Sequence, residues 1–106
     1  MMTEFSETKF EEKYVHYLDE LQEAYSNAYN QLHGQVDSRI LQAVDRQILS
    51  ESEPIYEGDG QFRVRLPEDT DERIAALPGD ENAIRDVLDT LTDGIASELR
   101  RIFGFE

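Results

Sequence analysis

The chain has 106 residues, enough for one hydrophobic core but not for two, so we expect a single domain over residues 1–106. Its 24 acidic and 10 basic residues give a formal net charge of -14, spread along the whole sequence rather than gathered in a tail. The absence of cysteine excludes disulfides, thiolate metal sites and redox chemistry through sulfur.

The first predicted helix begins at Thr8, which forms a capping-box pattern with Glu11 because each side chain can accept the other's free backbone N–H. Apolar and aromatic residues then recur every three or four positions as far as Leu32, and Gly34 is a typical stop signal. A straight helix from Thr8 to His33 would be roughly 38 Å long, which exceeds the width of a compact domain of this size. We therefore expect part of this helix to pack on another subunit.

A second helix is predicted to begin after Asp37, a favourable N-cap, with Val36 and Leu41 at the spacing of a hydrophobic staple. Apolar positions continue to Ile48, so we expect this helix to end near Ser50. The short link at Gly34–Gln35 between the first and second helices predicts that they form an antiparallel hairpin.

Between Pro54 and Pro67 the apolar residues change from the period of a helix to the alternation of a strand. In the second half of this segment they alternate with Arg63 and Arg65, and Asp59–Gly60 supplies the residues that a tight β-turn prefers. The segment predicts a β-hairpin. Because an isolated two-stranded ribbon is marginally stable, we expect its apolar face to pack on helices or its edge to pair with a second chain.

Thr70 is the predicted cap of a short helix that ends before a Pro-Gly pair, and Asp80 is the predicted cap of the last helix. Gly104 followed by Phe105 is typical of a Schellman ending, in which we expect Phe105 to fold toward Leu99. The apolar residues of the last helix have nearly heptad spacing: Ile84, Val87, Leu88, Leu91, Ile95, Leu99, Ile102 and Phe103. The predicted fold class is α+β, with a two-helix hairpin, a β-hairpin, a short helix and a long C-terminal helix.

The charged composition indicates a salt-adapted cytoplasm, because at 1 M salt the Debye length is only about 3 Å and repulsion among carboxylates is screened. Arginine outnumbers lysine by eight to two, and guanidinium groups pair with carboxylates in a planar, bidentate geometry. The first ten residues lack the pattern of a secretion signal. The longest apolar run, Ile74–Leu77, is far shorter than the ~20 residues of a transmembrane helix. We therefore expect a cytoplasmic protein that does not enter membranes.

No pattern of metal-binding, phosphate-binding or catalytic residues stands out. Glu12, His16 and Glu20 share one helix face, but such a triplet is unsurprising in a chain with this many carboxylates. The segment that begins at Asp69 lacks the Gly and Glu of a calcium loop, and the glycine-containing turns lack the Lys-Ser/Thr of a phosphate loop. No serine lies in a nucleophile elbow. We therefore expect no enzymatic activity, no cofactor and no small-molecule substrate.

Six residues are candidates for contacting a partner. Two are the arginines of the second strand, which project together from its outer face if the apolar residues face inward. Two more arginines lie in the last turn of the final helix, beside two phenylalanines. These basic groups could pair with the chain's own carboxylates, or they could contact RNA, phosphate or an acidic protein. The candidates are Arg63, Arg65, Arg100, Arg101, Phe103 and Phe105.

Three segments that together bracket nearly the whole chain carry a family resemblance. They are Lys13–Tyr17, Glu51–Val64 and Glu98–Glu106. In these segments the chain resembles a family of small acidic haloarchaeal proteins of unknown function. The resemblance implies a high-salt environment and brings no catalytic or binding residues with it.

Three functions are open at this point. The leading one is a non-enzymatic interaction or structural protein that forms a homodimer, which the long first helix, the near-heptad last helix and the isolated hairpin favour. The second is a nucleic-acid or ribosome accessory factor that uses Arg63, Arg65, Arg100 and Arg101. The third is mimicry of a phosphate backbone, which requires the acidic residues to be concentrated on one face.

Overall fold

The computed structural model describes residues 4–105. The elements, in chain order, are helices α1 (Glu7–Phe10), α2 (Lys13–His16), α3 (Leu18–Leu32) and α4 (Ser38–Gln47), the 3-10 helix η1 (Leu49–Glu51), strands β1 (Glu53–Gly58) and β2 (Gln61–Arg65), and helices α5 (Thr70–Ala76) and α6 (Glu81–Ile102). Six α-helices and one antiparallel hairpin in the described part confirm the predicted α+β class.

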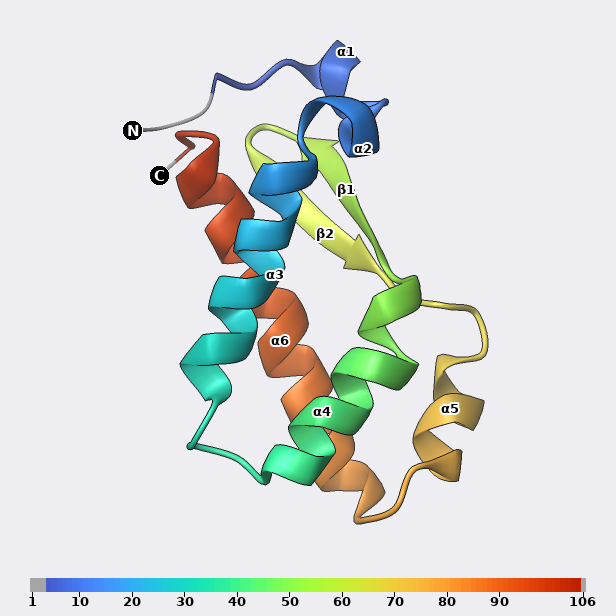
Figure 1. Cartoon of the computed structure of the whole chain (residues 1–106). Helices are drawn as coiled ribbons and strands as arrows, with labels where there is room; N and C mark the ends of the chain where they lie inside the picture. Colours follow the sequence, from blue (N-terminus) through green and yellow to red (C-terminus); the bar gives the residue numbers. More distant parts are fainter. Residues whose placement is uncertain (1–3, 106) are drawn as a thin grey trace.

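Helix α6 is the centre of the fold. Figure 1 shows α3 and α4 running in opposite directions along α6, with the β-hairpin beside its C-terminal half. Both α3 and α4 pack on α6, but they make little contact with each other. The antiparallel arrangement that the short link predicts is therefore present. The two helices are held by their contacts with α6 rather than by contact with each other.

The near-heptad stripe of α6 is buried, as an amphipathic pattern requires. Its core residues are Ile84, Val87, Leu88, Leu91, Ile95, Leu99 and Ile102. Gly94 lies where α3 approaches most closely, since a Cβ placed there would be 3.3 Å from the Cβ of Ala28. A glycine weakens a helix by about 1 kcal/mol relative to alanine, and here it allows the two helices to pack against each other.

The β-hairpin has the predicted turn. Phe62 pairs with Tyr56, and the turn places Asp59 at φ 52° and Gly60 at φ 74°, the left-handed values that a tight hairpin turn needs. Phe62 is buried and Arg63 is exposed, so the apolar side chains of β2 do face inward. Because β2 packs on α6, the apolar face of the hairpin is covered within the chain itself.

The prediction of one long helix from Thr8 to His33 is wrong. Ser6, not Thr8, caps α1, by accepting a hydrogen bond from the Lys9 N–H. The backbone leaves the helical region at Glu12 (φ -114°, ψ 46°) and again at Tyr17 (φ -129°, ψ 21°). Three helices replace the single one, and the 15 residues of α3 span only about 22 Å. The length of this segment no longer requires a second subunit.

The predicted helix ends are confirmed in part. Asp37 and Asp80 each cap a helix by accepting a backbone N–H two residues further on. Helix α4 ends at Gln47 rather than near Ser50, because η1 follows it. Thr70 is not a cap: it is the first residue of α5, and its hydroxyl donates to the backbone of the preceding loop.

The C-terminus forms the predicted Schellman motif. The Phe105 N–H donates to the Arg100 carbonyl at 2.8 Å and the Gly104 N–H donates to the Arg101 carbonyl at 3.2 Å, which is the 6→1 and 5→2 pattern of that motif. The Phe105 side chain, however, lies against the hairpin turn. A Cβ placed on Gly60 would be 2.9 Å from its ring, so the turn glycine makes room for Phe105.

Candidate functional site

The two arginines of β2 are exposed on the outer face of the hairpin, as predicted. Arg63 Nε lies 3.0 Å from a Glu57 carboxylate oxygen, and Arg65 pairs with Glu53. Both partners come from β1, the neighbouring strand. Of the two uses that the sequence left open for these arginines, pairing with the chain's own carboxylates is therefore present in the structure.

The two arginines at the end of α6 also contact groups of the same chain. Arg101 Nη2 lies 3.0 Å from an oxygen of Glu98, whose carboxylate also accepts a 2.7 Å hydrogen bond from Asn27 on α3. The hydrogen bond from Arg101 holds the pKa of Glu98 below its usual value. Arg100 Nη1 donates to the Gly60 carbonyl at 2.7 Å. These contacts join α6 to α3 and to the hairpin turn.

The two C-terminal phenylalanines belong to a cluster of seven aromatic rings, which we call the aromatic cluster. Its members are Phe5, Phe10, Tyr17, Tyr56, Phe62, Phe103 and Phe105. Phe5 contacts the other six rings, with centroid distances from 4.7 to 6.2 Å. Phe103 is buried and Phe105 is 36% exposed. Of this candidate pair, Phe105 alone reaches the surface.

A groove that the sequence did not indicate as a site lies along α3. Its larger part is a hollow of about 480 Å³. The lining residues come from α2, α3, η1 and β1 and the residues beside them: Tyr14, Leu18, Leu21, Gln22, Tyr25, Leu49, Ser50, Ser52 and Pro54. None of them is charged, although 32% of the residues in the chain are. An uncharged hollow on a chain of this composition is a candidate for binding something apolar.

Helix α3 forms one wall of the groove because two stripes of residues run along it, one apolar and one that mixes apolar, aromatic and amide side chains. The first faces α6 and is buried: Leu21, Ala24 and Ala28. The second lies at steps of four, three and four residues, which keeps it on one helix face, and it consists of Leu18, Gln22, Tyr25 and Tyr29. Within residues 4–105, α3 and α4 hardly touch each other, and Tyr25 and Tyr29 of this stripe remain partly exposed.

The exposed apolar surface of the molecule is concentrated at the upper end of this wall. Val15 is 77% exposed, Tyr14 55% and Leu18 45%. Tyr14 and Leu18 line the hollow, whereas Val15 does not. These three residues lie within five consecutive positions, at the junction of α2 and α3. Grouped exposure of this kind is typical of a binding surface, while single exposed apolar residues are not.

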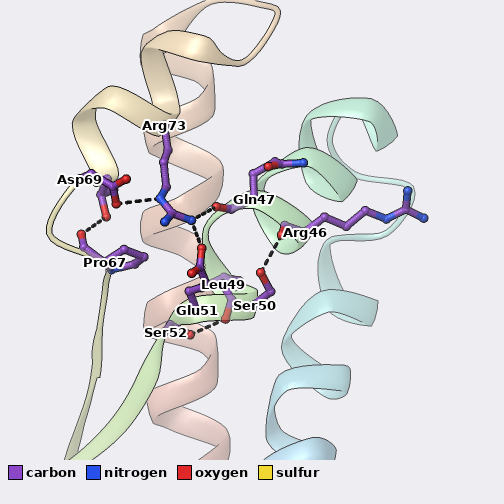
Figure 2. Close-up of polar contacts among 10 residues, drawn as sticks. Arg46, Gln47, Leu49, Ser50, Glu51, Ser52, Pro67, Asp69 and Arg73 are labelled. Atoms are coloured by element: carbon purple, nitrogen blue, oxygen red, sulfur yellow. Dashed lines mark hydrogen bonds and ion pairs between the residues drawn. The ribbon is translucent and has the colours of Figure 1, made fainter.

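The opposite wall of the groove is fixed by a polar network at the corner between α4 and η1. Figure 2 shows Arg73 reaching from α5 to this corner. Its Nε donates to Asp69 at 2.7 Å, and its Nη1 donates to the Gln47 carbonyl at 2.8 Å and to the Glu51 carboxylate. Ser50 Oγ donates to the Arg46 carbonyl at 2.6 Å. The corner that carries Leu49 and Ser50 of the groove lining is thus held by Arg73 of α5 and by the hydrogen bond to α4.

Tyr25 connects the two walls. Ser52 Oγ donates to the Leu49 carbonyl at 2.7 Å, so its one proton is used there and Tyr25 is the donor in the 2.9 Å hydrogen bond between the two hydroxyls. Burial raises the pKa of Tyr25 to about 12, which keeps the phenol protonated, as a donor must be. The floor of the groove is therefore pre-formed at this point.

A second hollow of about 260 Å³ continues the groove past Tyr25. It is lined by Tyr25, Ser26, Tyr29 and Asn30 of α3 and by Asp45 of α4. Asp45 is half-buried, and burial raises its pKa although the neighbouring Arg46 partly offsets the effect. Among residues 4–105, no hydrogen bond or ion pair satisfies the Asp45 carboxylate. We call the two hollows together the α3 groove: it is apolar at the Leu18 end and carries one unpaired carboxylate at the Asp45 end.

The sequence contained a weak signal for this groove. The tyrosines of the first predicted helix fit either the core or an interface, and the apolar stripe is widened where Tyr17 and Leu18 are adjacent. Tyr17 enters the aromatic cluster and Leu18 remains on the surface. Which of two adjacent residues faces the core depends on the break in the helix at Tyr17, and the apolar period does not show that break.

The described residues carry no group of His, Cys, Asp and Glu side chains that could hold a metal ion. None of the helices in the described range 4–105 combines the length and the apolar character that crossing a bilayer requires. The fold is thus a small α+β domain with a groove along α3 whose larger hollow has no charged lining residue.

The chain belongs to a family of unknown function, DUF5783, which it matches over residues 2–106. This confirms the resemblance to a family without an assigned function. No curated protein and no solved structure matches the chain.

Proposed function

We propose that the protein is a non-enzymatic interaction protein that binds another polypeptide chain in the α3 groove. The observation that carries this proposal is the uncharged lining of the larger hollow of the groove, with Tyr14 and Leu18 about half exposed at its rim. Burying these side chains under a partner would remove apolar surface from water at a gain of about 25 cal/mol per Å². Tyrosine is favourable in such a surface because it combines a large ring with a polar tip.

The same proposal includes a salt-adapted cytoplasm as the place of action. The charge of -14 would repel like-charged molecules at low ionic strength, and molar salt screens that repulsion. An apolar contact does not depend on long-range attraction and gains strength when salts are excluded from protein surfaces. A groove whose larger hollow is uncharged is therefore a suitable binding surface in concentrated salt.

The homodimer that the sequence predicts stays a prediction. The features that suggested it are occupied within one chain: the long helix is divided, β2 packs on α6, and the near-heptad stripe of α6 is buried. Light scattering in about 2–3 M KCl, where the charge is screened, tests it. A dimer that dissociates when Leu18 is replaced by Ser would support a second copy as the occupant of the groove, and a monomer at micromolar concentration would exclude it.

The alternative of an RNA or ribosome factor has less support, because Arg63, Arg65 and Arg101 each lie against a carboxylate of the same chain. The double variant Arg63→Glu/Arg65→Glu tests it. Unchanged recovery of RNA and ribosomal proteins from a high-salt lysate would count against the arginine patch.

The proposed function is tested by site-specific crosslinking. Because the chain has no cysteine, a single Cys at position 22 can carry a benzophenone group into the groove. A matched control carries the same group at Gln42, an exposed glutamine on α4 that does not line the groove. In a high-salt lysate of the source cells we expect a discrete protein adduct from position 22 and none from position 42. Equal labelling at both positions, or no adduct at all, would overturn the proposal.

A further inference from the structure

The α3 groove occupies the place of a missing helix. Helices α3 and α4 flank α6 (Figure 1) and hardly touch each other. The smaller hollow lies between α3 and α4, and the larger one continues it between α3 and the η1–β1 segment that follows α4. In a four-helix bundle each helix packs on two neighbours, so a helix laid between α3 and α4 would complete the arrangement. We infer that the α3 groove binds a basic amphipathic helix of about three turns from a partner protein. This inference rests on the proposed function and names the chemistry of the partner.

The length of the partner helix follows from the stripe of α3 that lines the groove. The stripe runs from Leu18 to Tyr29 at steps of four, three and four residues, the spacing with which one helix packs along another. Eleven residue steps correspond to about 17 Å, so a partner helix of about 12 residues covers the groove. Tyr25 lies in the middle, fixed by its hydrogen bond to Ser52.

The chemistry of the partner follows from the difference between the two ends of the groove. At one end the walls are Leu18, Leu21, Leu49 and Pro54, which suit leucine-like side chains. At the other end Asp45 is half-buried and has no partner within the described residues. An unpaired carboxylate in a partly desolvated place is unfavourable until a cation meets it. A Lys or Arg about two turns from the apolar side chains of the partner would supply that cation.

Charge favours such a partner over a second copy of this chain. In molar salt the net charge of -14 is screened beyond a few ångströms, so the choice between partners depends on a side chain that contacts Asp45 directly. A second copy would offer its exposed apolar residues on α2 and at the start of α3, where the basic side chains are Lys13 and His16. His16 lies 3.7 Å from a Glu12 carboxylate oxygen of its own helix. Lys13 is buried and lies 2.7 Å from Glu53, so it is not free to reach Asp45 of a partner.

Fluorescein-labelled helical peptides of 15 residues test the inference by anisotropy. Three peptides share one leucine face and differ at a single position two turns beyond it, where they carry Lys, Gln or Glu. For the native chain we expect the Lys peptide to bind roughly fivefold tighter than the Gln peptide and the Glu peptide to bind weakest. Asp45→Asn should abolish this order. Equal binding of the three peptides to the native chain would overturn the inference.

Two further variants locate the binding site. Leu18→Ser should weaken all three peptides roughly tenfold, while Val15→Ser, which changes a more exposed residue outside the groove lining, should leave them unchanged. Circular dichroism verifies that each variant is folded. Identical losses in both variants would show that the peptides bind elsewhere and would overturn the inference. Crosslinking from position 22 separates the two proposals: a captured partner without a basic helix refutes this inference alone, and the absence of any partner refutes both.

Discussion

The aromatic cluster and the α3 groove are built from the same kinds of side chain with opposite outcomes. In the cluster, seven rings contact one another, and Phe5 alone touches six of them. In the groove, Tyr14, Tyr25 and Tyr29 make no ring-to-ring contact with any aromatic residue in the described range 4–105. Tyr25 and Tyr29 pack against the core from the side of the groove and stay partly exposed there, and Tyr14 is 55% exposed.

The aromatic cluster and the α3 groove also differ in how their polar groups are used. At the cluster, Tyr17 accepts a hydrogen bond from the Ser6 N–H and donates one to the Glu4 carbonyl, so the segment before α1 is held over the rings. At the groove, Asp45 has no such partner. The cluster should therefore respond to mutation through stability, and the groove through binding.

The largest expected effect is that of Phe103→Ala in the cluster. Phe103 is 5% exposed and contacts four other rings, and removing a buried phenylalanine costs about 3–5 kcal/mol. Urea-induced unfolding at constant high salt measures this change. A loss below about 1 kcal/mol, the scale of an ordinary mutation, would mean that the cluster is not a closed core.

The hairpin turn is the next most sensitive point. Gly60→Ala places a methyl group at left-handed φ and against the Phe105 ring, which together should cost about 2–4 kcal/mol. Gly34→Ala is a matched control, because Gly34 also has positive φ but has no atom within 4 Å of a Cβ placed on it. Its loss should be limited to about 1–2 kcal/mol. Equal losses in the two variants would show that the close contact between Phe105 and the turn does not contribute to the cost of Gly60→Ala.

A smaller and pH-dependent effect is expected at Glu53, which pairs with Lys13 and Arg65 between the cluster and the groove. The hydrogen bond from Lys13 holds the pKa of Glu53 below its usual value of 4.5. A lowered pKa in the folded state contributes stability above the unfolded value that is lost as the pH falls through the folded value. Glu53→Gln should therefore cost about 1–3 kcal/mol at pH 7.

Unfolding curves measured at several pH values test the sign of this effect. The difference between the native chain and Glu53→Gln should shrink as the pH falls below 4.5, the usual value of this carboxyl group. A difference that is constant with pH, or that grows in acid, would contradict the Lys13–Glu53 pair as its source.

The smallest effect on stability is expected in the groove. Leu18 is 45% exposed, so Leu18→Ser should change the free energy of unfolding by about 0.5 kcal/mol or less, the range of surface substitutions. Thermal unfolding in high salt measures it against Val15→Ser. A loss of several kcal/mol would show that Leu18 is part of the core. The α3 groove would then contribute to stability as the aromatic cluster does.

Much of the fold could be predicted from local signals. Asp37 and Asp80 cap their helices, the Asp59–Gly60 turn closes the hairpin, and Gly104 ends α6. Each of these depends on the residue at one position and its immediate neighbours. The breaks at Glu12 and Tyr17 could not be predicted in this way, because the apolar period continues across both of them.

The cause of those breaks is a set of tertiary contacts. With the helix broken at these two points, Phe10 and Tyr17 enter the aromatic cluster and Lys13 reaches Glu53, which is 40 positions further along the chain. The candidate site likewise combines local features that the sequence predicts with tertiary contacts that it does not. The arginines of β2 were correctly placed on the outer face, but their carboxylate partners and the α3 groove both depend on which elements meet in space.

The central claim, that the α3 groove binds a partner chain, is tested most directly by the yield of crosslinked protein from position 22 with and without Leu18. The account predicts a discrete adduct from the otherwise native chain in high-salt lysate, reduced roughly tenfold by Leu18→Ser and unchanged by Val15→Ser. An adduct of equal yield in all three chains would contradict it.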